Sequence, residues 1–200
     1  MTGKLFVISG PSGVGKGSIV EKLLAAGKKI YFSVSATTRP RRSYETDGRE
    51  YWFVSREEFL DRIESGRMLE WAEYNGNYYG TPAGPVDEKL REGYDVLLDV
   101  ETHGMYSVKR LRPEAVTIFV YPPTFAELER RLRGRKTETE ETIRGRLETG
   151  RRECVHAPDY DYIIINDDLD TAAAEAAAIM TAEKCRTAER LHFLKEDKTL

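Results

Sequence analysis

Short apolar runs, separated by stretches with helical spacing, dominate the pattern of this chain. Such runs, without the strict alternation of a half-exposed strand, are typical of parallel strands that helices cover on both faces. Strands alternating with helices predict an α/β domain with a parallel sheet and right-handed crossovers. The expected strands are Leu5–Ile8, Ile30–Val34, Asp95–Val100, Val116–Val120 and Tyr162–Asn166.

The stretches between these runs predict the helices. Helical spacing of apolar residues spans Ile19–Leu24 and Val86–Leu90, and another helix is expected between the third and fourth strands. Thr124 and Glu127 have the spacing of a capping pair for a helix over 125–133. The alanine-rich segment 171–194 predicts one long closing helix, after which 195–200 would fray.

Residues 35–81 interrupt this alternation and predict a small mixed α/β lobe inserted into the core. Tyr51–Val54 is expected as a strand, and Ser55 with Glu58 would cap the helix that follows. Asn75-Gly76, between two strand-like segments, is the strongest hairpin signal in the chain.

Residues 134–152 are nearly all charged or small, with Ile143 and Leu147 as the main apolar anchors. The segment therefore resembles a mobile lid, loosely held when the site is empty. Length alone would allow two small domains. The expected division is a single domain with a core of residues 1–34, 82–133 and 153–200, the lobe at 35–81 and the lid at 134–152.

A glycine-rich segment follows the first strand and leads directly into the first helix. It reads Gly10-Pro11-Ser12-Gly13-Val14-Gly15-Lys16-Gly17-Ser18. In a strand–loop–helix context, backbone amides and the helix N-terminus bind phosphate, and the lysine reaches the outer phosphates. A glycine-rich turn without a ligand is the alternative, and the flanking strand and helix argue against it. The segment predicts a loop that binds a nucleoside triphosphate.

The loop differs from many phosphate-binding loops at the position that usually binds Mg²⁺. Gly17 stands where many such loops have the serine or threonine that binds Mg²⁺, and the hydroxyl comes one residue later, at Ser18. Asp99 ends a predicted buried strand and would face the ligand-binding edge of the sheet, with Glu101 on the same face. We expect Mg²⁺ to come as MgATP and to lie near Ser18 and Asp99, the latter through water. Asp99 and Glu101 could instead only solvate the strand end.

The composition and charge exclude several classes of protein. The chain has 200 residues, 40% of them hydrophobic, and a formal net charge of −3, so no overall field favours nucleic acid or an anionic membrane. Cys154 and Cys185 form no motif, and the three histidines lack metal-ligand spacing. No apolar run approaches the roughly 20 residues of a membrane helix, and we expect no signal peptide ahead of the first strand. We expect a cytoplasmic protein, either a monomer or a homodimer.

The lobe contains groups that suit a guanine base. Guanine has two adjacent donors, N1–H and the N2 amine, and an acceptor at O6. Glu70 could accept from the two donors, and Thr81 and Ser35 offer hydroxyls for O6. Adenine would leave such a buried carboxylate unpaired, a mismatch that can cost ~10⁴–10⁵ in specificity. Tyr51 and Tyr79 could donate to a phosphate or could simply pack.

Transfer of a phosphoryl group needs cationic donors fixed around its oxygens. Three groups of arginines are candidates: Arg39 with Arg42, Arg131 with Arg135, and Arg146. An isolated arginine is more often a solvated surface residue. Clustering of the first group beside a proline, in a segment without helical spacing, favours a binding role.

Several motifs, taken in order, resemble guanylate kinase. They are Gly10–Ser18, Ser35–Arg39 with Arg42, Asp47–Tyr51, Glu70–Ala72, Asn77–Thr81, Arg131-Leu132 with Gly134-Arg135, and Asn166–Leu169. The resemblance covers about Leu5 to Asp170 and implies a P-loop NTPase-type fold with ATP and GMP as substrates. Glu101 and His103 depart from the family pattern, where many members have aspartate and glutamine.

The resemblance also implies roles for individual residues. ATP would be bound by the loop Gly10–Ser18 and by Arg131, Asn166 and Asp167, the last two near the adenine. GMP would be bound by Ser35, Arg39, Arg42, Tyr51, Glu70, Tyr79, Thr81, Asp99 and Glu101. The groups implied to act on the transferring phosphoryl group are Lys16, Arg42, Arg135 and Arg146.

Two other functions share parts of this pattern. Guanylate-kinase-like scaffolding domains bind phosphorylated peptides and usually have a damaged phosphate loop, whereas Gly13, Gly15, Lys16 and Ser18 are intact here. A kinase of sugar phosphates would have no use for the guanine-binding groups. Conversion of ATP and GMP to ADP and GDP is therefore the expected reaction.

Overall fold

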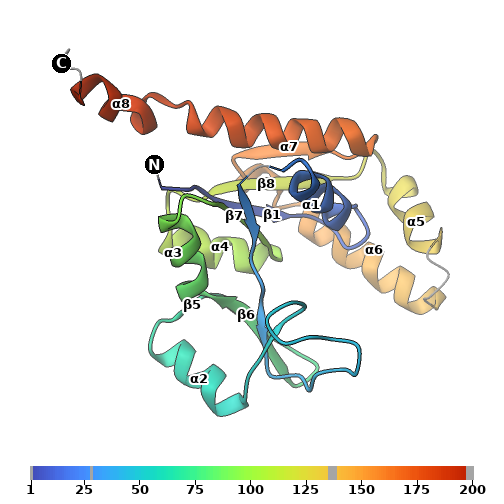
Figure 1. The fold of residues 1–200 in the computed structure, drawn as a ribbon. Helices are drawn as coiled ribbons and strands as arrows, with labels where there is room; N and C mark the ends of the chain where they lie inside the picture. The colour runs from blue at the N-terminus through green and yellow to red at the C-terminus, as the bar shows by residue number, and fades with distance from the viewer. Residues whose placement is uncertain (1, 28, 135–138, 197–200) are drawn as a thin grey trace.

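A computed structural model describes residues 2–27, 29–134 and 139–196 of the chain. Its larger sheet has the strand order β2-β7-β1-β8-β9, and all neighbouring strands are parallel. The strands are β1 (Leu5–Ser9), β2 (Ile30–Phe32), β7 (Asp95–Asp99), β8 (Val116–Tyr121) and β9 (Tyr162–Ile165). The predicted parallel sheet is confirmed. Strand β2 ends at Phe32 instead of Val34, where the chain leaves for a second sheet (Figure 1).

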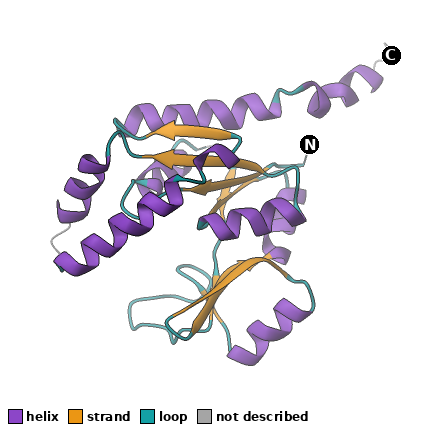
Figure 2. Ribbon diagram, turned by 180° about the vertical axis from the view of Figure 1, so that it is seen from behind, coloured by secondary structure: helices purple, strands orange, loops and turns teal. Residues whose placement is uncertain are grey.

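β1 lies in the middle of the larger sheet, and its side chains alternate between two hydrophobic cores. Phe6 and Ile8 belong to one core, and Leu5 and Val7 belong to the other. The first core includes side chains of α1 (Lys16–Ala25), α5 (Phe125–Gly134), α6 (Glu140–Cys154) and α7 (Leu169–Lys184). The second core includes side chains of α3 (Ala83–Arg91) and α4 (Thr102–Leu111). Helices therefore cover both faces of the sheet (Figure 2), as the apolar runs predict.

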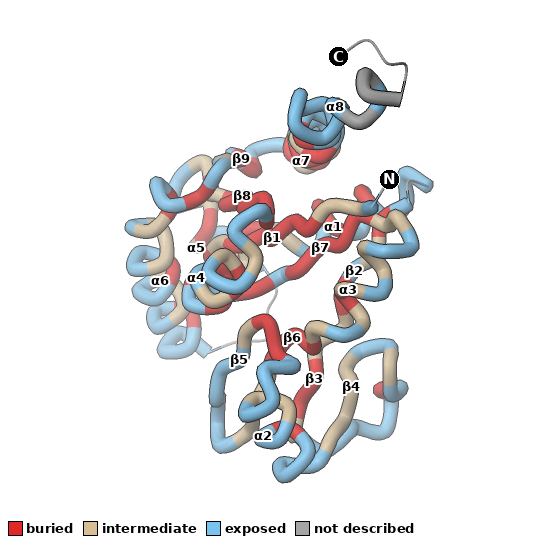
Figure 3. Tube along the Cα trace, turned by 90° about the vertical axis from the view of Figure 1, so that its left-hand side faces the viewer, coloured by how far each residue is buried: buried red, intermediate tan, exposed pale blue. Residues whose placement is uncertain are grey.

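The second sheet has the order β4-β3-β6-β5 and lies within the segment predicted to form a lobe. Its strands are β3 (Ala36–Thr37), β4 (Trp52–Phe53), β5 (Met68–Tyr74) and β6 (Asn77–Pro82). Helix α2 (Arg56–Glu64) packs against it through Phe59, which is fully buried. β5 also contacts α4, so the lobe rests on the larger sheet's helical layer. Burial is concentrated in β1, β7 and β8, while most of the lobe is exposed or half-buried (Figure 3).

The predicted hairpin turn and helix N-caps have the expected geometry in the structure. Asn75 and Gly76 have φ values of 48° and 75°, the left-handed conformations that a two-residue type I′ hairpin turn requires. Thr124 Oγ1 accepts from the Glu127 amide at 3.0 Å, and α2 is capped in the same way by Ser55. The Glu127 carboxylate does not complete a capping box; it turns to the guanidinium of Arg131.

The prediction of a single C-terminal helix over 171–194 was wrong. The segment forms α7 and a separate helix, α8 (Thr187–Glu196). Ala172, Ala176 and Met180 hold α7 in the core, whereas the described side chains of α8 are exposed and the helix continues past the sheet (Figure 1). The apolar contacts that hold α7 in the core do not continue into α8, so this segment does not stay on the axis of α7. Lys195 and Glu196 are helical, and the rest of the predicted frayed end, 197–200, lies outside the described residues. Nowhere in the described ranges is a helix long and apolar enough to cross a membrane.

Candidate active site

The glycine-rich loop connects the carboxyl end of β1 to α1. Gly10, Gly13 and Gly15 have φ values of 142°, 87° and 106°, which residues with a side chain rarely adopt. A Cβ on Gly10 would lie 2.3 Å from the carbonyl oxygen of Val120, so the backbone there leaves no room for a side chain. α1 begins at Lys16 without a side-chain cap and without an acidic residue in its first turn. Its first amides are therefore suited to an anion.

Two side chains from distant segments hold this loop in place. Asn166, which follows β9 and is 4% exposed, donates its Nδ2 to the Val14 carbonyl at 2.7 Å. Arg131 on α5 donates to the same carbonyl at 3.2 Å and to the carbonyl of Asp167 at 3.4 Å. The structure thus brings three of the predicted ATP-binding residues to the loop. Asn166 uses its amide nitrogen to support the loop, and its predicted place near adenine stays a prediction.

Lys16 and Asp99 meet where the loop crosses the sheet edge. Lys16 Nζ donates to the Gly10 carbonyl at 2.7 Å and lies 3.8 Å from Asp99 Oδ1. Asp99 is the last residue of β7, which pairs with β1. Burial raises the pKa of Asp99, and the nearby ammonium of Lys16 lowers it in part. Asp99 therefore occupies the predicted position beside the phosphate loop.

The donors near the loop fit Mg²⁺ that is held mainly by phosphates and water. Ser18 is exposed on the first turn of α1, and Asp99 offers a carboxylate with a third of its side chain exposed. Within the described part of the chain, no cluster of three or more His, Cys, Asp or Glu side chains could hold a metal ion. Mg²⁺ in kinases is usually bound by one or two carboxylates and substrate phosphates, which is compatible with this arrangement.

A cavity of about 360 Å³ opens between the lobe and the carboxyl edge of the larger sheet. It brings together most of the residues predicted to bind GMP. Those that line it are Ser35, Tyr51, Glu70, Tyr79, Asp99 and Glu101, and His103 also lines it. Asp99 joins this cavity to the phosphate loop, because its carboxylate is also the neighbour of Lys16.

Glu70 is aimed into the cavity by an irregularity of its strand. A register shift between Met68 and Glu70 places Glu70 opposite Thr81. Thr81 Oγ1 donates to Glu70 Oε1 at 2.6 Å, and Thr81 is 2% exposed. Burial raises the pKa of Glu70, with Glu101 adding to the rise and Thr81 opposing it. A carboxylate and a hydroxyl are thereby fixed side by side, the pair of groups that guanine would need.

Glu101 does not lie on the strand face predicted for it. β7 ends at Asp99, and Glu101 is the N-cap residue of α4 with φ −70° and ψ 167°. The chain turns here because the helix that follows buries Met105 and Val108 against the sheet. Glu101 nevertheless lines the cavity and interacts electrostatically with Asp99 and Glu70.

Arg39 has a buried carboxylate partner that the sequence analysis missed. Its Nη2 donates to Glu45 Oε1 at 2.6 Å, and its Nη1 donates to Oε2 at 3.1 Å. Glu45 is 6% exposed and also accepts from the backbone amide of Arg42 at 2.8 Å. Glu45 is the first acid after three closely spaced arginines, and this is the signal that could have indicated the pairing.

Arg39 and two tyrosines form one group at the edge of the cavity. The Arg39 guanidinium lies 5.6 Å from the centre of the Tyr51 ring, and the Tyr51 and Tyr79 rings meet edge to face at 6.0 Å. Arg42 points elsewhere: it is exposed and donates to the Tyr44 hydroxyl at 2.8 Å. Of the two arginines predicted to bind the GMP phosphate, only Arg39 lies with the tyrosines in this structure.

The predicted lid largely coincides with α6. The helix extends to Cys154, two residues past the predicted boundary, and Ile143 anchors it in the first core with 4% exposure. Arg146 Nη1 donates to Ser12 Oγ at 2.7 Å, so one predicted lid arginine lies against the phosphate loop. Arg135 lies outside the described residues.

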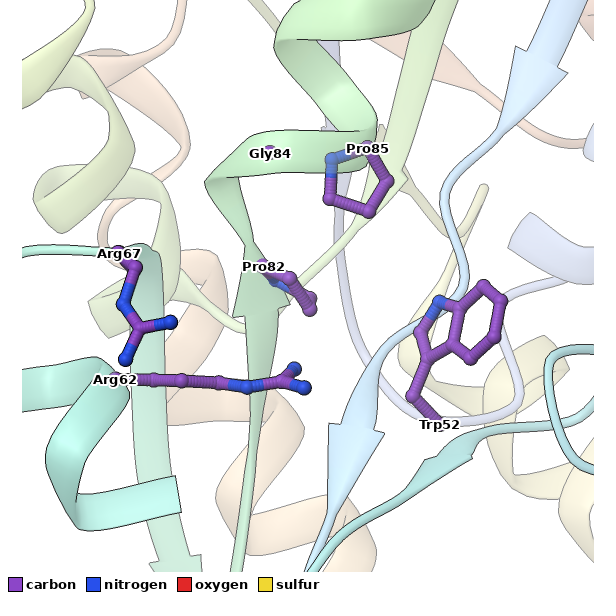
Figure 4. A pocket seen from close by; sticks show the side chains of 6 residues that line it. All are labelled: Trp52, Arg62, Arg67, Pro82, Gly84 and Pro85. Carbon is purple, nitrogen blue, oxygen red and sulfur yellow. The ribbon is translucent and has the colours of Figure 1, made fainter. Parts of the chain in front are cut away.

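A second cavity, of about 300 Å³, lies where the lobe meets α3. Its lining residues are Trp52, Arg62, Arg67, Pro82, Gly84 and Pro85 (Figure 4). Arg62 donates to Glu58 Oε1 at 2.6 Å, and Arg67 pairs with Asp61, so both charges have acidic partners. No residue of the glycine-rich loop lines this cavity. This cavity therefore lacks the loop that would bind the phosphates of ATP.

Comparisons with known proteins agree with this geometry. The guanylate kinase family model matches residues 2–183. The chain is 47% identical to a guanylate kinase of Desulfitobacterium hafniense (strain Y51), over 92% of each chain. It is 50% identical to a guanylate kinase of Symbiobacterium thermophilum, over 92% of this chain and 88% of that one. A crystal structure of guanylate kinase from Anaplasma phagocytophilum has a TM-score of 0.73 and 33% identity, covering 94% of this chain and 89% of that one.

Proposed function

The chain belongs to the guanylate kinase family and transfers the γ-phosphoryl group of ATP to GMP, and we propose how its residues divide this work. The observation that carries the proposal is the single cavity that Glu70 and Asp99 both line. Glu70 belongs to the guanine-suited pair, and Asp99 is the neighbour of Lys16 in the phosphate loop. An acceptor bound at Glu70 would therefore extend toward phosphates bound at Lys16.

ATP is proposed to bind with its phosphates over residues 10–18. The uncapped start of α1 supplies amides and a partial positive charge, and Lys16 moves from the Gly10 carbonyl to the outer phosphates. Mg²⁺, bound as MgATP, would neutralise charge on the phosphate oxygens, with Asp99 holding one of its waters near Ser18. Arg131 and Asn166 maintain the loop geometry that this binding requires, with Asp167 beside them.

GMP is proposed to bind with its base at Glu70 and its phosphate at Arg39. Glu70 accepts from guanine N1–H and the N2 amine, and the hydroxyl of Ser35 donates to O6. Thr81, whose one hydroxyl proton is donated to Glu70, is proposed to orient that carboxylate beside the base. Arg39, oriented by Glu45, donates to the phosphate together with Tyr51 and Tyr79. The proposed phosphate-binding residues also include Arg42. These groups would contact the base and the phosphate of GMP but not its ribose, so dGMP is proposed as a second acceptor.

Arginines are proposed to stabilise the charge that develops on the transferring phosphoryl group. Arg146 lies against Ser12 of the loop. Arg135, for which the resemblance to guanylate kinase implies the same role, is proposed to act with it. Guanidinium groups suit this task because their planar fork matches phosphate oxygens. Both cysteines are free thiols, which fits the cytoplasmic location that we also propose.

The test is a coupled assay of ADP release with GMP, dGMP, IMP, AMP and UMP as acceptors. We expect GMP and dGMP to be used, and IMP to be used poorly because it lacks the N2 amine. Glu70→Gln should lower kcat/KM for GMP by roughly 30–1,000-fold, since the amide loses the charge and turns a donor toward guanine's donors. The KM for ATP should change little, and Glu57→Gln, an exposed acid on α2, is the matched control.

Two results would count against this assignment. Absence of ADP release with GMP would contradict the reaction itself. Unchanged kcat/KM for GMP in a folded Glu70→Gln variant would contradict only the assignment of the base-binding residue.

A further inference from the structure

Gly104 is a buried glycine in the first turn of α4, the helix that contacts strand β5 of the lobe. Unlike Gly10, Gly13 and Gly15, it has no positive φ, so its backbone conformation is one that any residue adopts. Glycine is also among the least favourable residues for the interior of a helix. Neither the backbone conformation nor helix propensity therefore accounts for a glycine at this position.

The space beside Gly104 is occupied by the side chain of Glu70. A Cβ on Gly104 would lie 3.2 Å from Oε2 and 3.4 Å from Cγ of Glu70, and 3.1 Å from Cβ of Val100. Cβ atoms rarely approach other atoms so closely, so a neighbour would have to move by a few tenths of an ångström. At Gly84, an exposed glycine of helix α3, an added Cβ would meet nothing within 4 Å among the described residues.

The packing around Gly104 determines which neighbour would move. Val100 belongs to the second hydrophobic core, and α4 is held in the same core by buried side chains such as Met105. Glu70 instead lines the cavity proposed for GMP, so its side chain has open space on one side. Thr81 holds Oε1 of Glu70 at 2.6 Å, whereas Oε2 is the oxygen next to Gly104. An added methyl group would therefore push Oε2 into the cavity.

We propose that Gly104 is a positioning residue for guanine recognition: by having no side chain, it leaves the space in which the Glu70 carboxylate lies and so sets how far that carboxylate projects toward the base. This inference rests on the proposed function of Glu70. Gly104 touches no reacting atom in this account and acts through Glu70.

Steady-state kinetics of Gly104→Ala test the role, because this variant adds one methyl group. The kcat/KM for GMP should fall by about 3–30-fold through a higher KM, less than the roughly 100-fold that a misplacement of 1 Å can cost. The KM for ATP should stay within about twofold, since the phosphate loop is unchanged. IMP has no N2 amine and so loses fewer contacts with Glu70, which should narrow the preference for GMP over IMP. Gly84→Ala, the matched control, should behave as the unmodified enzyme.

A double-mutant cycle separates positioning of Glu70 from a general effect on the helix. In the Glu70→Ala background no carboxylate remains to be displaced, so Gly104→Ala should change kcat/KM for GMP by less than about twofold. An equal loss in both backgrounds would overturn the proposal. So would an unchanged preference for GMP over IMP, or a Gly104→Ala variant that matches Gly84→Ala.

Calorimetric titration of GMP in the absence of ATP tests the same contact without turnover. The Kd for GMP should rise by about 3–30-fold in Gly104→Ala and stay unchanged in Gly84→Ala, while circular dichroism verifies that both variants are folded. An unchanged Kd in Gly104→Ala would overturn the proposal. If Glu70→Gln left the use of GMP unchanged, the proposed function of Glu70 would fail. A loss in Glu70→Gln without one in Gly104→Ala would overturn the positioning role alone.

Discussion

Burial of Glu70 has opposite consequences for recognition and for stability. The raised pKa of this carboxyl means that the folded protein binds its proton more readily than the unfolded chain does. The favourable contribution of the group is therefore present at low pH and is lost as pH rises through the folded pKa. At pH 8 the ionised Glu70 destabilises the empty protein, and the donors of guanine would offset that cost only when GMP binds.

Glu70→Gln is accordingly expected to stabilise the empty enzyme while impairing it. The melting temperature at pH 8 should rise by roughly 2–4 °C, corresponding to about 1 kcal/mol in a domain of this size. At pH 5.5 the gain should be smaller, because more Glu70 is protonated there. Differential scanning fluorimetry at the two pH values, with Glu57→Gln as control, makes the comparison. A lower melting temperature for Glu70→Gln at pH 8 would show that the ionised carboxylate stabilises the empty fold.

In this structure Lys16 contacts groups of the protein, whereas its proposed partners during the reaction are the phosphates of ATP. Its ammonium is bonded to the Gly10 carbonyl and faces Asp99. Lys16→Ala should therefore leave the fold and GMP affinity nearly intact while lowering kcat by at least about 10²–10³-fold, the loss typical of a deleted electrostatic donor. Lys22→Ala, on the same helix and paired with Asp170 at the surface, is the control. Near-normal turnover by a folded Lys16→Ala variant would show that the loop takes no part in the reaction.

At the scale of elements, α6 shows how a charged segment can still be a fixed part of the core. The sequence of residues 134–152 predicts a loosely held lid, yet Ile143 is as buried as many strand residues. Much of α6 is nevertheless exposed, including Arg144, Arg151 and Arg152. Motion in the described part of this segment is then expected to involve side chains and helix sliding more than unfolding.

Arg146→Ala should lower kcat by about 10³-fold with little change in nucleotide affinity, because its charge is proposed to matter mainly in the transition state. Arg146→Lys should rescue poorly, since a point charge cannot reproduce the guanidinium fork. Arg152→Ala, which removes an exposed arginine of the same helix, is the matched control. A rise in KM alone would mean that Arg146 binds the ground state and that the lid assignment is incorrect.

At the scale of the whole molecule, the sequence predicted those features that depend on neighbouring residues. The parallel strands, the hairpin at Asn75-Gly76 and the N-cap bonds of Ser55 and Thr124 follow from local spacing and are confirmed. The reciprocal role predicted for Glu127 is not, because its carboxylate binds Arg131. The prediction for 171–194 was wrong because its outcome depends on whether α1 lies alongside.

Contacts between distant segments were beyond the reach of the sequence. Asn166 bonds the carbonyl of Val14, 152 residues earlier in the chain, and no local pattern indicates that contact. Glu45 beneath Arg39 and the register shift before Glu70 likewise depend on how the lobe folds. The sequence therefore predicted which residue types gather at the site more completely than it predicted what holds them there.

The central place of β1 determines when the enzyme can first bind ATP during its own synthesis. Along the chain β1 precedes both of its neighbours: β7 follows roughly 90 residues later and β8 roughly 110 residues later. At translation rates of about 5–20 residues per second, roughly 5–20 seconds pass before strands are present on both sides of β1. Its apolar run stays unpaired in that interval, a state in which chaperones bind nascent chains. Nucleotide can assist only the final stage of folding, once β8 and the Asn166 segment have closed around the loop.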